Sequence, residues 1–134
     1  MTKKILVVED DAADRKNLVV ALEKEGYSVV EALNIDEVMN KVRVTVPDLV
    51  ITDVVLPEIN GYDICRNIKT AMQPHPPFVL MVTGKAAAIK VALAQKMGAD
   101  GFEVKTSDMA HVVKAVRKLF SCKGTRPNNF WSEK

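Results

Sequence analysis

The stretch "DLVITDVVLPEINGYD" at residues 48–63 places an acid at the end of an apolar run. The letters "LVIT" favour a buried strand, because apolar and β-branched residues fit a pleated surface that other elements cover. Asp53 then stands at the carboxyl end of that strand, and Pro57 and Gly61 predict a tight loop after it. A carboxylate in this position is either a solvated strand end or part of a functional site.

Similar apolar runs occur on both sides of this stretch, and each is followed by a segment with helical periodicity. Asn34 is a suitable N-cap with Glu37 in the capping-box position, and Gly26 and Gly98 are suitable helix stops. Strands are predicted at residues 4–8, 27–32, 48–53, 78–82 and 101–104. Helices are predicted from about residue 12 to 25, from 35 onward, and at 62–72, 85–98 and 107–120.

Five strands that alternate with helices indicate a parallel sheet covered on both faces. Right-handed crossovers then predict an α/β fold with a doubly wound, five-stranded parallel sheet in the flavodoxin-like order 2-1-3-4-5. One domain is expected over residues 1–120. Residues 121–134 break the periodicity and are predicted to be a C-terminal tail or linker.

The composition is typical of a soluble globular protein, with 134 residues, 48% hydrophobic and 27% charged. A net charge of +2 is too small to indicate direct nucleic-acid binding or a membrane surface as a partner. No apolar run approaches the ~20 residues of a membrane span, and the first residues lack the pattern of a signal peptide. Two cysteines without motif spacing predict reduced thiols in a cytoplasmic protein.

Polar residues follow four of the predicted strands. Ligands of such sheets bind beyond the carboxyl ends of the strands, near the switch point between the first and third strands. The first strand is followed by Glu9 and Asp10, the third ends in Asp53, the fourth is followed by Thr83, and the fifth is followed by Lys105. We therefore expect these five side chains to share one edge of the sheet.

Their chemistry favours a divalent cation and a phosphoryl group. Neighbouring carboxylates repel one another unless a cation compensates them, and a hard all-oxygen site suits Mg²⁺, or Mn²⁺, better than zinc or copper. Together with Lys105, such an ion would neutralise phosphoryl oxygens, and the Thr83 hydroxyl can donate to another. Asp53 can then act as a nucleophile that forms an acyl phosphate.

Four stretches, "ILVVEDD" at 5–11, "VITDVVLPEINGYD" at 50–63, "VLMVTG" at 79–84 and "GFEVK" at 101–105, resemble the receiver domain of two-component response regulators. The resemblance covers about residues 4–120 and implies that a histidine kinase or a histidine phosphotransfer protein phosphorylates the aspartate of the third strand.

The resemblance also implies a role for each matching residue. Asp53 is the expected phosphoacceptor, and Asp10 is the expected direct metal ligand beside it. Glu9 is expected to act on the metal through water, and the backbone carbonyl of Val55 is expected to complete the protein ligands.

Two further positions match the switch residues of that family, and Lys105 matches its phosphate-pairing lysine. Thr83 is the expected switch hydroxyl and Phe102 the expected aromatic switch residue. Phosphorylation is then expected to alter the surface of the fourth helix, fifth strand and last helix. That surface would serve a downstream effector protein, an output domain missing from this chain, or a homodimer. Such a protein is a signalling module whose only catalysis is its own phosphorylation and dephosphorylation.

The sequence departs from the family pattern after the lysine, where the usual proline is replaced by Thr106. A cis bond before a non-proline residue costs about 2.5–4 kcal/mol, so a trans bond between Lys105 and Thr106 is predicted, with a rearranged loop before the last helix. Val55 and Lys85 are expected to influence how long the phosphate survives.

Two other functions compete with phosphotransfer. A pseudo-receiver would keep the fold and act as a protein-interaction module, and the replacement at Thr106 slightly favours it. A phosphohydrolase working through an aspartyl phosphate would need a second acid shortly after the nucleophile, and Val54 and Val55 do not supply one.

Overall fold

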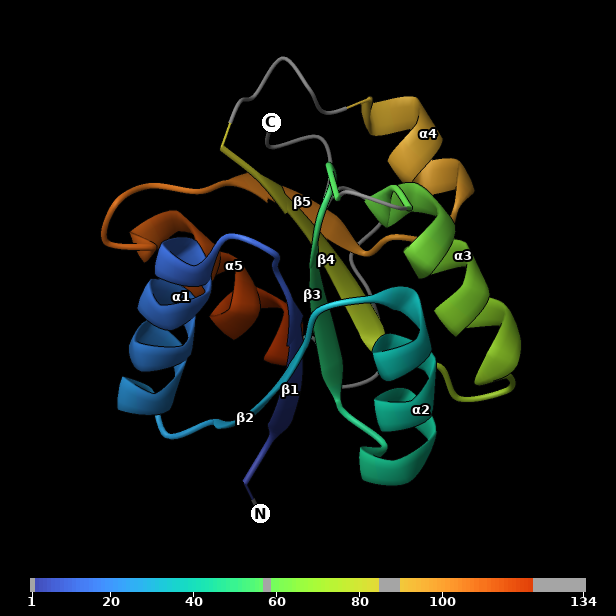
Figure 1. Ribbon diagram of the computed structural model, residues 1–134, viewed down its shortest axis with the longest axis horizontal. Coiled ribbons are helices and arrows are strands. Elements are labelled where there is room, and N and C mark those ends of the chain that lie inside the picture. Colours follow the sequence, from blue (N-terminus) through green and yellow to red (C-terminus); the bar gives the residue numbers. More distant parts are fainter. Residues whose placement is uncertain (1, 57–58, 85–89, 122–134) are drawn as a thin grey trace.

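In the computed structural model, which describes residues 2–56, 59–84 and 90–121, five parallel strands form one sheet in the order β2-β1-β3-β4-β5. This is the predicted α/β fold (Figure 1). The strands are β1 (Lys4–Val8), β2 (Ser28–Ala32), β3 (Leu49–Asp53), β4 (Phe78–Thr83) and β5 (Gly101–Val104). The helices are α1 (Ala12–Lys24), α2 (Ile35–Thr45), α3 (Gly61–Ala71), α4 (Val91–Lys96) and α5 (Ala110–Phe120).

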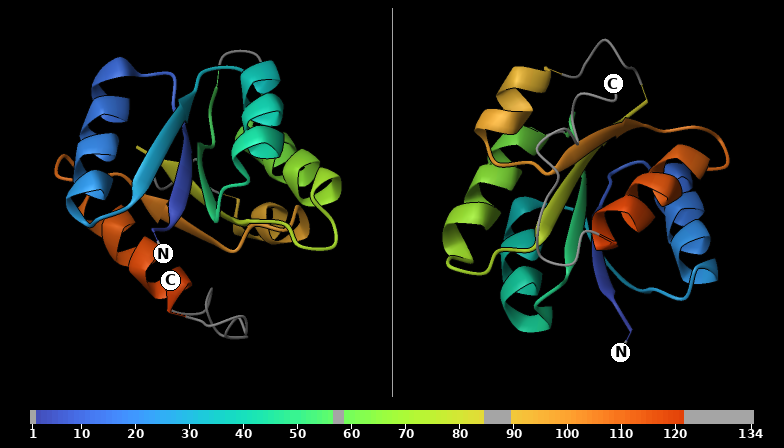
Figure 2. Two further views of the ribbon diagram at one scale, coloured as in Figure 1. Left: turned by 90° about the horizontal axis from the view of Figure 1, so that it is seen from below. Right: turned by 180° about the vertical axis from the view of Figure 1, so that it is seen from behind.

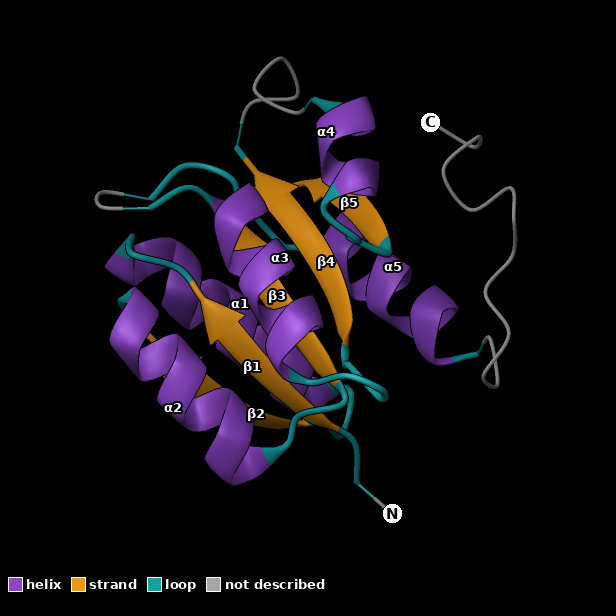
Figure 3. Ribbon diagram, turned by 90° about the vertical axis from the view of Figure 1, so that its right-hand side faces the viewer, coloured by secondary structure: helices purple, strands orange, loops and turns teal. Residues whose placement is uncertain are grey.

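Helices cover both faces of the sheet. α1 and α5 pack on one face, and α2, α3 and α4 pack on the other, as the views in Figures 2 and 3 show. Successive residues of β1 therefore enter different cores: Ile5 and Val7 pack with α1 and α5, whereas Leu6 and Val8 pack with α2 and α3. This double coverage explains why the central strands are apolar at nearly every position.

The helix ends are largely where the sequence places them. Asn34 caps α2 by accepting a hydrogen bond from the Glu37 N–H, and Glu37 in return accepts one from the Leu33 N–H. Gly26 and Gly98 follow α1 and α4 with φ of +93° and +94°, in the left-handed region that glycine tolerates best. These four assignments are confirmed.

The last two helices are shorter than predicted. α4 begins at Val91, because Lys90 has extended backbone angles; residues 85–89 of the predicted helix lie outside the described residues. α5 begins at Ala110 rather than at Ser107, so that prediction is wrong. The reason is a local turn: the Asp108 carboxylate accepts hydrogen bonds from the Thr106 hydroxyl and the Ala110 N–H, and Met109 has a positive φ.

A buried ion pair joins α3 to the sheet at the end opposite the polar edge. Lys69 Nζ lies 2.7 Å from a carboxylate oxygen of Asp100 and donates to the Pro77 carbonyl at 2.8 Å. The same Asp100 oxygen accepts from the Val79 N–H. The pair therefore connects the end of α3, the start of β4 and the residue before β5.

No helix of the described residues is long and apolar enough to cross a membrane.

Gly61 starts α3 against the end of β3. A methyl group at this position would lie 2.2 Å from the backbone oxygen of Asp53 and 3.1 Å from the Met81 side chain. The Gly61 N–H also donates to the Val54 carbonyl at 2.8 Å. The tight geometry predicted for Gly61 is thus a close approach between the helix and the strand, whereas Pro57 lies outside the described residues.

Gly61→Ala is expected to lower the free energy of unfolding by about 1–3 kcal/mol, because the new methyl group has to displace the backbone of Asp53 or the whole first turn of α3. Urea denaturation followed by circular dichroism measures the change. The matched control is Gly84→Ala, since nothing lies within 4 Å of a Cβ there. An equal effect of both substitutions would contradict this account.

Cys65 is a second buried position with a measurable consequence. Burial raises the pKa of the Cys65 thiol to about 12, and the thiol contacts the Met97 carbonyl. Because the thiolate is the nucleophile, we expect Cys65 to resist iodoacetamide at pH 8 in the folded protein and to react in denaturant. Peptide mass spectrometry reads this out, and rapid alkylation of Cys65 under native conditions would show that the thiol is more accessible than described.

Candidate functional site

Three carboxylates meet at the carboxyl edge of the sheet, at the switch point between β1 and β3. Glu9 and Asp10 follow β1, Asp53 ends β3, and each offers an oxygen within 4.8 Å of the others. Glu9 and Asp53 are buried, with 1% and 7% of their surface exposed, whereas Asp10 is exposed. The sequence predicted this convergence from strand order alone.

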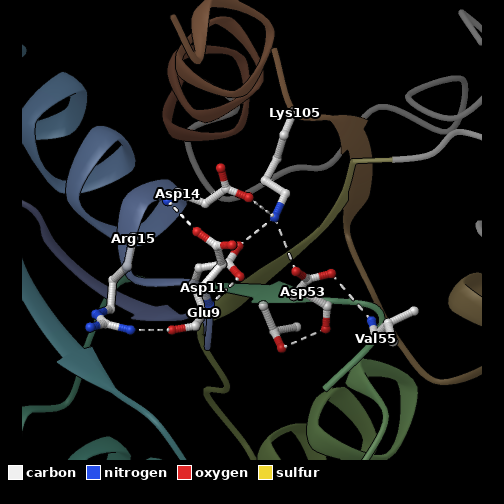
Figure 4. Close-up of polar contacts among 8 residues, drawn as sticks. Glu9, Asp11, Asp14, Arg15, Asp53, Val55 and Lys105 are labelled. Atoms are coloured by element: carbon white, nitrogen blue, oxygen red, sulfur yellow. Dashed lines mark hydrogen bonds and ion pairs between the residues drawn. The ribbon is translucent and has the colours of Figure 1, made fainter. Parts of the chain in front are cut away.

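Both oxygens of Asp53 accept a hydrogen bond (Figure 4). The Val55 N–H donates to Oδ1 at 3.2 Å, and Lys105 Nζ donates to Oδ2 at 3.1 Å. The backbone is fixed as well, because the Val54 N–H continues the ladder to the Val82 carbonyl of β4. The carboxylate is therefore oriented by its own loop and by a residue that follows β5.

Lys105 lies at the centre of the site. Its Nζ contacts oxygens of three carboxylates, at 2.5 Å from Glu9, 2.9 Å from Asp14 and 3.1 Å from Asp53. Burial lowers the pKa of Lys105, but the hydrogen bonds to Glu9, Asp14 and Asp53 outweigh it, so the pKa lies above its usual value. One positive charge thus faces three acids.

The pKa of the Glu9 carboxyl is raised even though Lys105 binds it. Burial raises the pKa of Glu9 to about 7, and the negative charge of Asp53 adds to the effect, while the hydrogen bond from Lys105 opposes it. The position of Glu9 is secured by the Asp11 N–H, which donates to its carboxylate, and by Arg15, which donates to its carbonyl.

The donor set fits a hard divalent cation. Glu9, Asp10 and Asp53 supply only oxygen ligands, and they carry more negative charge than Lys105 balances. Oxygen ligands and uncompensated charge are the properties that Mg²⁺ and Mn²⁺ require. Val55 lies beside this cluster with its side chain exposed and its N–H turned to Asp53.

Thr83 and Phe102 lie on β4 and β5, two neighbouring strands of the sheet. Thr83 ends β4, is buried, and accepts the Lys105 N–H at its carbonyl, with a distance of 2.7 Å. Phe102 pairs with Met81 across β4 and β5, is half-buried, and packs against the core beneath α3 and α4. The two expected switch residues therefore lie on paired strands, two register positions apart.

Sequence reasoning missed two residues of the site, Asp14 and Arg15. Asp14 belongs to the first turn of α1 and reaches Lys105 across the sheet edge, and Arg15 links the Glu9 carbonyl to Glu31 of β2. Their position in the sequence was the available signal. Asp14 and Arg15 lie in the first turn of the helix that follows the acids after β1, and that turn lies at the same edge of the sheet as those acids. Asp11, between these residues and the acids after β1, is the N-cap of α1.

The bond between Lys105 and Thr106 is trans, as predicted. In the described residues the one cis peptide bond joins Gln73 and Pro74. The loop before α5 contains a turn around Asp108, and its rearrangement relative to the family stays a prediction.

The chain is similar to known proteins in sequence and in fold. The family model of the response regulator receiver domain matches residues 5–117. The alkaline phosphatase synthesis transcriptional regulatory protein PhoP of Bacillus subtilis is 34% identical over 105 residues, which cover 78% of this chain and 43% of that protein. The DNA-binding response regulator MtrA of Mycobacterium tuberculosis is 34% identical over 117 residues, which cover 87% of this chain and 50% of that protein.

The fold has close counterparts among solved structures. The response regulator TrrA of Thermotoga maritima, determined in complex with Mg²⁺ and BeF, superposes with a TM-score of 0.78 at 29% identity, covering 88% of this chain and 99% of that one. This chain spans about half the length of PhoP and MtrA. On the family match, the two relatives and the shared fold, the chain belongs to the response regulator receiver domains.

Proposed function

We propose that this chain is a phospho-accepting receiver, in which Asp53 takes a phosphoryl group from a phosphohistidine of a histidine kinase or a histidine phosphotransfer protein. The observation that carries the proposal is the position of Lys105, which binds Asp53 and Glu9 together at the switch point of the sheet. A strand-end acid that was only solvated would not share a buried ammonium with a second acid.

In the proposed step, a carboxylate oxygen of Asp53 attacks phosphorus, the P–N bond of the phosphohistidine breaks, and its electron pair stays on the imidazole nitrogen. Lys105 pairs with the phosphoryl oxygens, and the Thr83 hydroxyl donates to another of them. When bound by Asp10, Asp53, the Val55 carbonyl and, through water, Glu9, Mg²⁺ or Mn²⁺ would supply charge neutralisation of the transferred group.

The proposed output is a change of surface. Once phosphoryl oxygens occupy the site, Thr83 moves toward them and Phe102 repacks, so the surface of α4, β5 and α5 changes. Phe102 has no hydroxyl, so this switch works by packing alone. The protein is a signalling module rather than a metabolic enzyme.

The proposed partners of that surface are a downstream effector protein, an output domain outside this chain, or a second copy of the chain. PhoP and MtrA bear names that include transcriptional regulation and DNA binding, and this chain covers about half of each. We place the receiver at residues 1–120 and a tail or linker at 121–134, and we place its action in the cytoplasm.

A pseudo-receiver remains the second candidate because Thr106 replaces the family's proline beside Lys105. In that case the domain binds a partner through the same fold without phosphotransfer. The experiment below separates the two functions.

With Mg²⁺ and acetyl phosphate, the wild-type protein is expected to gain the mass of one phosphoryl group, and EDTA is expected to prevent the gain. Asp53→Asn should abolish it, because the amide is a far weaker nucleophile than the carboxylate. Asp63→Asn is the matched control, since Asp63 is an exposed acid in the first turn of α3. No mass gain in the wild type with any donor or kinase would favour the pseudo-receiver.

Lys105→Met is expected to lower the free energy of unfolding in EDTA by about 1–3 kcal/mol, because the buried carboxyl groups of Glu9 and Asp53 would lose the ammonium that donates to them. Mg²⁺ should restore part of the loss, since a cation that binds the native state stabilises it. Denaturation with and without Mg²⁺ measures both effects, and Lys114→Met, at an exposed position of α5, is the control. If Mg²⁺ stabilised neither protein, the assignment of the metal ligands would be wrong.

A further inference from the structure

Asp14 adds a contact to Lys105 that the proposed phosphotransfer does not use. It lies in the first turn of α1, and its Oδ2 is 2.9 Å from Lys105 Nζ. Its backbone is fixed, because the Asp14 N–H donates a hydrogen bond of 2.9 Å to the carboxylate of Asp11, the N-cap of the helix. Figure 4 shows Asp14 approaching Lys105 from the side of α1, opposite to Asp53. The start of α1 therefore determines where the short side chain of Asp14 meets Lys105.

The ammonium group of Lys105 has three N–H donors, and three carboxylates accept them. Before Lys105 can donate to a phosphoryl group, one of these three bonds has to be released. The donor count makes the three acids and an incoming phosphoryl group competitors for the same ammonium.

Burial decides which acid is released. The side chains of Glu9 and Asp53 are only 1% and 10% exposed, so before the attack, while Asp53 is still a carboxylate, either would lose its cation without gaining water. The Asp14 side chain is 40% exposed and can turn toward solvent, where its charge is hydrated. Asp14 is thus the partner that Lys105 gives up at the lowest cost.

We infer that Asp14 is a positioning residue that holds Lys105 in the unphosphorylated state and competes with the phosphoryl group for it. This inference rests on the proposed phosphotransfer to Asp53. When Asp53 attacks the phosphorus of acetyl phosphate, the P–O bond to acetate breaks and its electron pair leaves with acetate. Lys105 exchanges Asp14 for phosphoryl oxygens in the same step. Asp14 therefore slows phosphorylation and keeps the basal state unmodified.

Asp14→Asn tests this, because asparagine keeps the shape of the side chain and removes the charge that binds Lys105. At saturating Mg²⁺, its rate of phosphorylation by acetyl phosphate should exceed that of the wild type roughly two- to fivefold, the size expected for a partly exposed ion pair. Thermal melting confirms that the variant is folded. An unchanged or slower rate in a folded Asp14→Asn protein would overturn the inference.

Asp11→Asn is the matched control. It removes one negative charge from the same end of α1, asparagine still caps the helix, and Asp11 makes no contact with Lys105. If the gain came from general repulsion between the donor and the acidic edge, both variants would accelerate the reaction equally. Release of Lys105 predicts acceleration in Asp14→Asn and less than half of that gain in Asp11→Asn.

A second readout does not depend on phosphorylation. In the metal-free protein, the ¹H–¹⁵N signal of the Lys105 ammonium group, assigned by its loss in Lys105→Arg, should be protected from exchange with water. Asp14→Asn should shift and broaden it, whereas Asp11→Asn should leave it unchanged. If the wild type took no phosphate but the Lys105 signal shifted in Asp14→Asn, the proposed phosphotransfer would be refuted and the contact between Asp14 and Lys105 supported. If the wild type were phosphorylated but the Lys105 signal did not change in Asp14→Asn, the inferred role of Asp14 alone would be refuted.

Discussion

The ammonium group of Lys105 compensates the negative charge of the buried acids, and the rest of the site depends on this compensation. Lys105 follows β5, yet its Nζ lies among acids that come from the ends of β1 and β3 and from the first turn of α1. Without this contact, the buried carboxylates of Glu9 and Asp53 would repel each other where water cannot screen them. The order of the strands, the caps of the helices and the close approach at Gly61 all serve to hold these charges at fixed separations. Burial raises the pKa of Glu9 even with Lys105 bonded to it.

The sheet and the core of the site could be predicted from the sequence because both follow from regular patterns. Apolar runs gave the strands, the doubly wound topology gave their order, and the ends of parallel strands had to bring Asp53 and Lys105 to one edge. Asp14 could not be predicted in the same way. Its contact depends on the angle at which α1 leaves β1 and on the rotamer of Lys105, and neither has a periodic signature in the sequence.

The start of α5 was mispredicted for a related reason. Thr106, Ser107 and Asp108 are residues that favour either a helix start or a local turn, and the sequence pattern of the helix was extended through them. In the structure the Asp108 carboxylate accepts hydrogen bonds from the Thr106 hydroxyl and the Ala110 N–H. A turn therefore precedes the helix along the chain, and α5 begins only at Ala110. The turn directly follows the trans bond between Lys105 and Thr106.

The ion pair between Lys69 and Asp100 limits how this domain can be recombined with others. Its two halves lie on separate segments of the chain, one at the end of α3 and the other just before β5, and both are buried. A chimera with a related domain that is joined between Ala71 and Phe78 would take each charge from a different parent. Unless both parents carried the pair, the hybrid would bury an ammonium or a carboxylate alone, a cost that its otherwise intact active edge could not reveal. Junctions before α3 or after β5 keep Lys69 and Asp100 in the same parent.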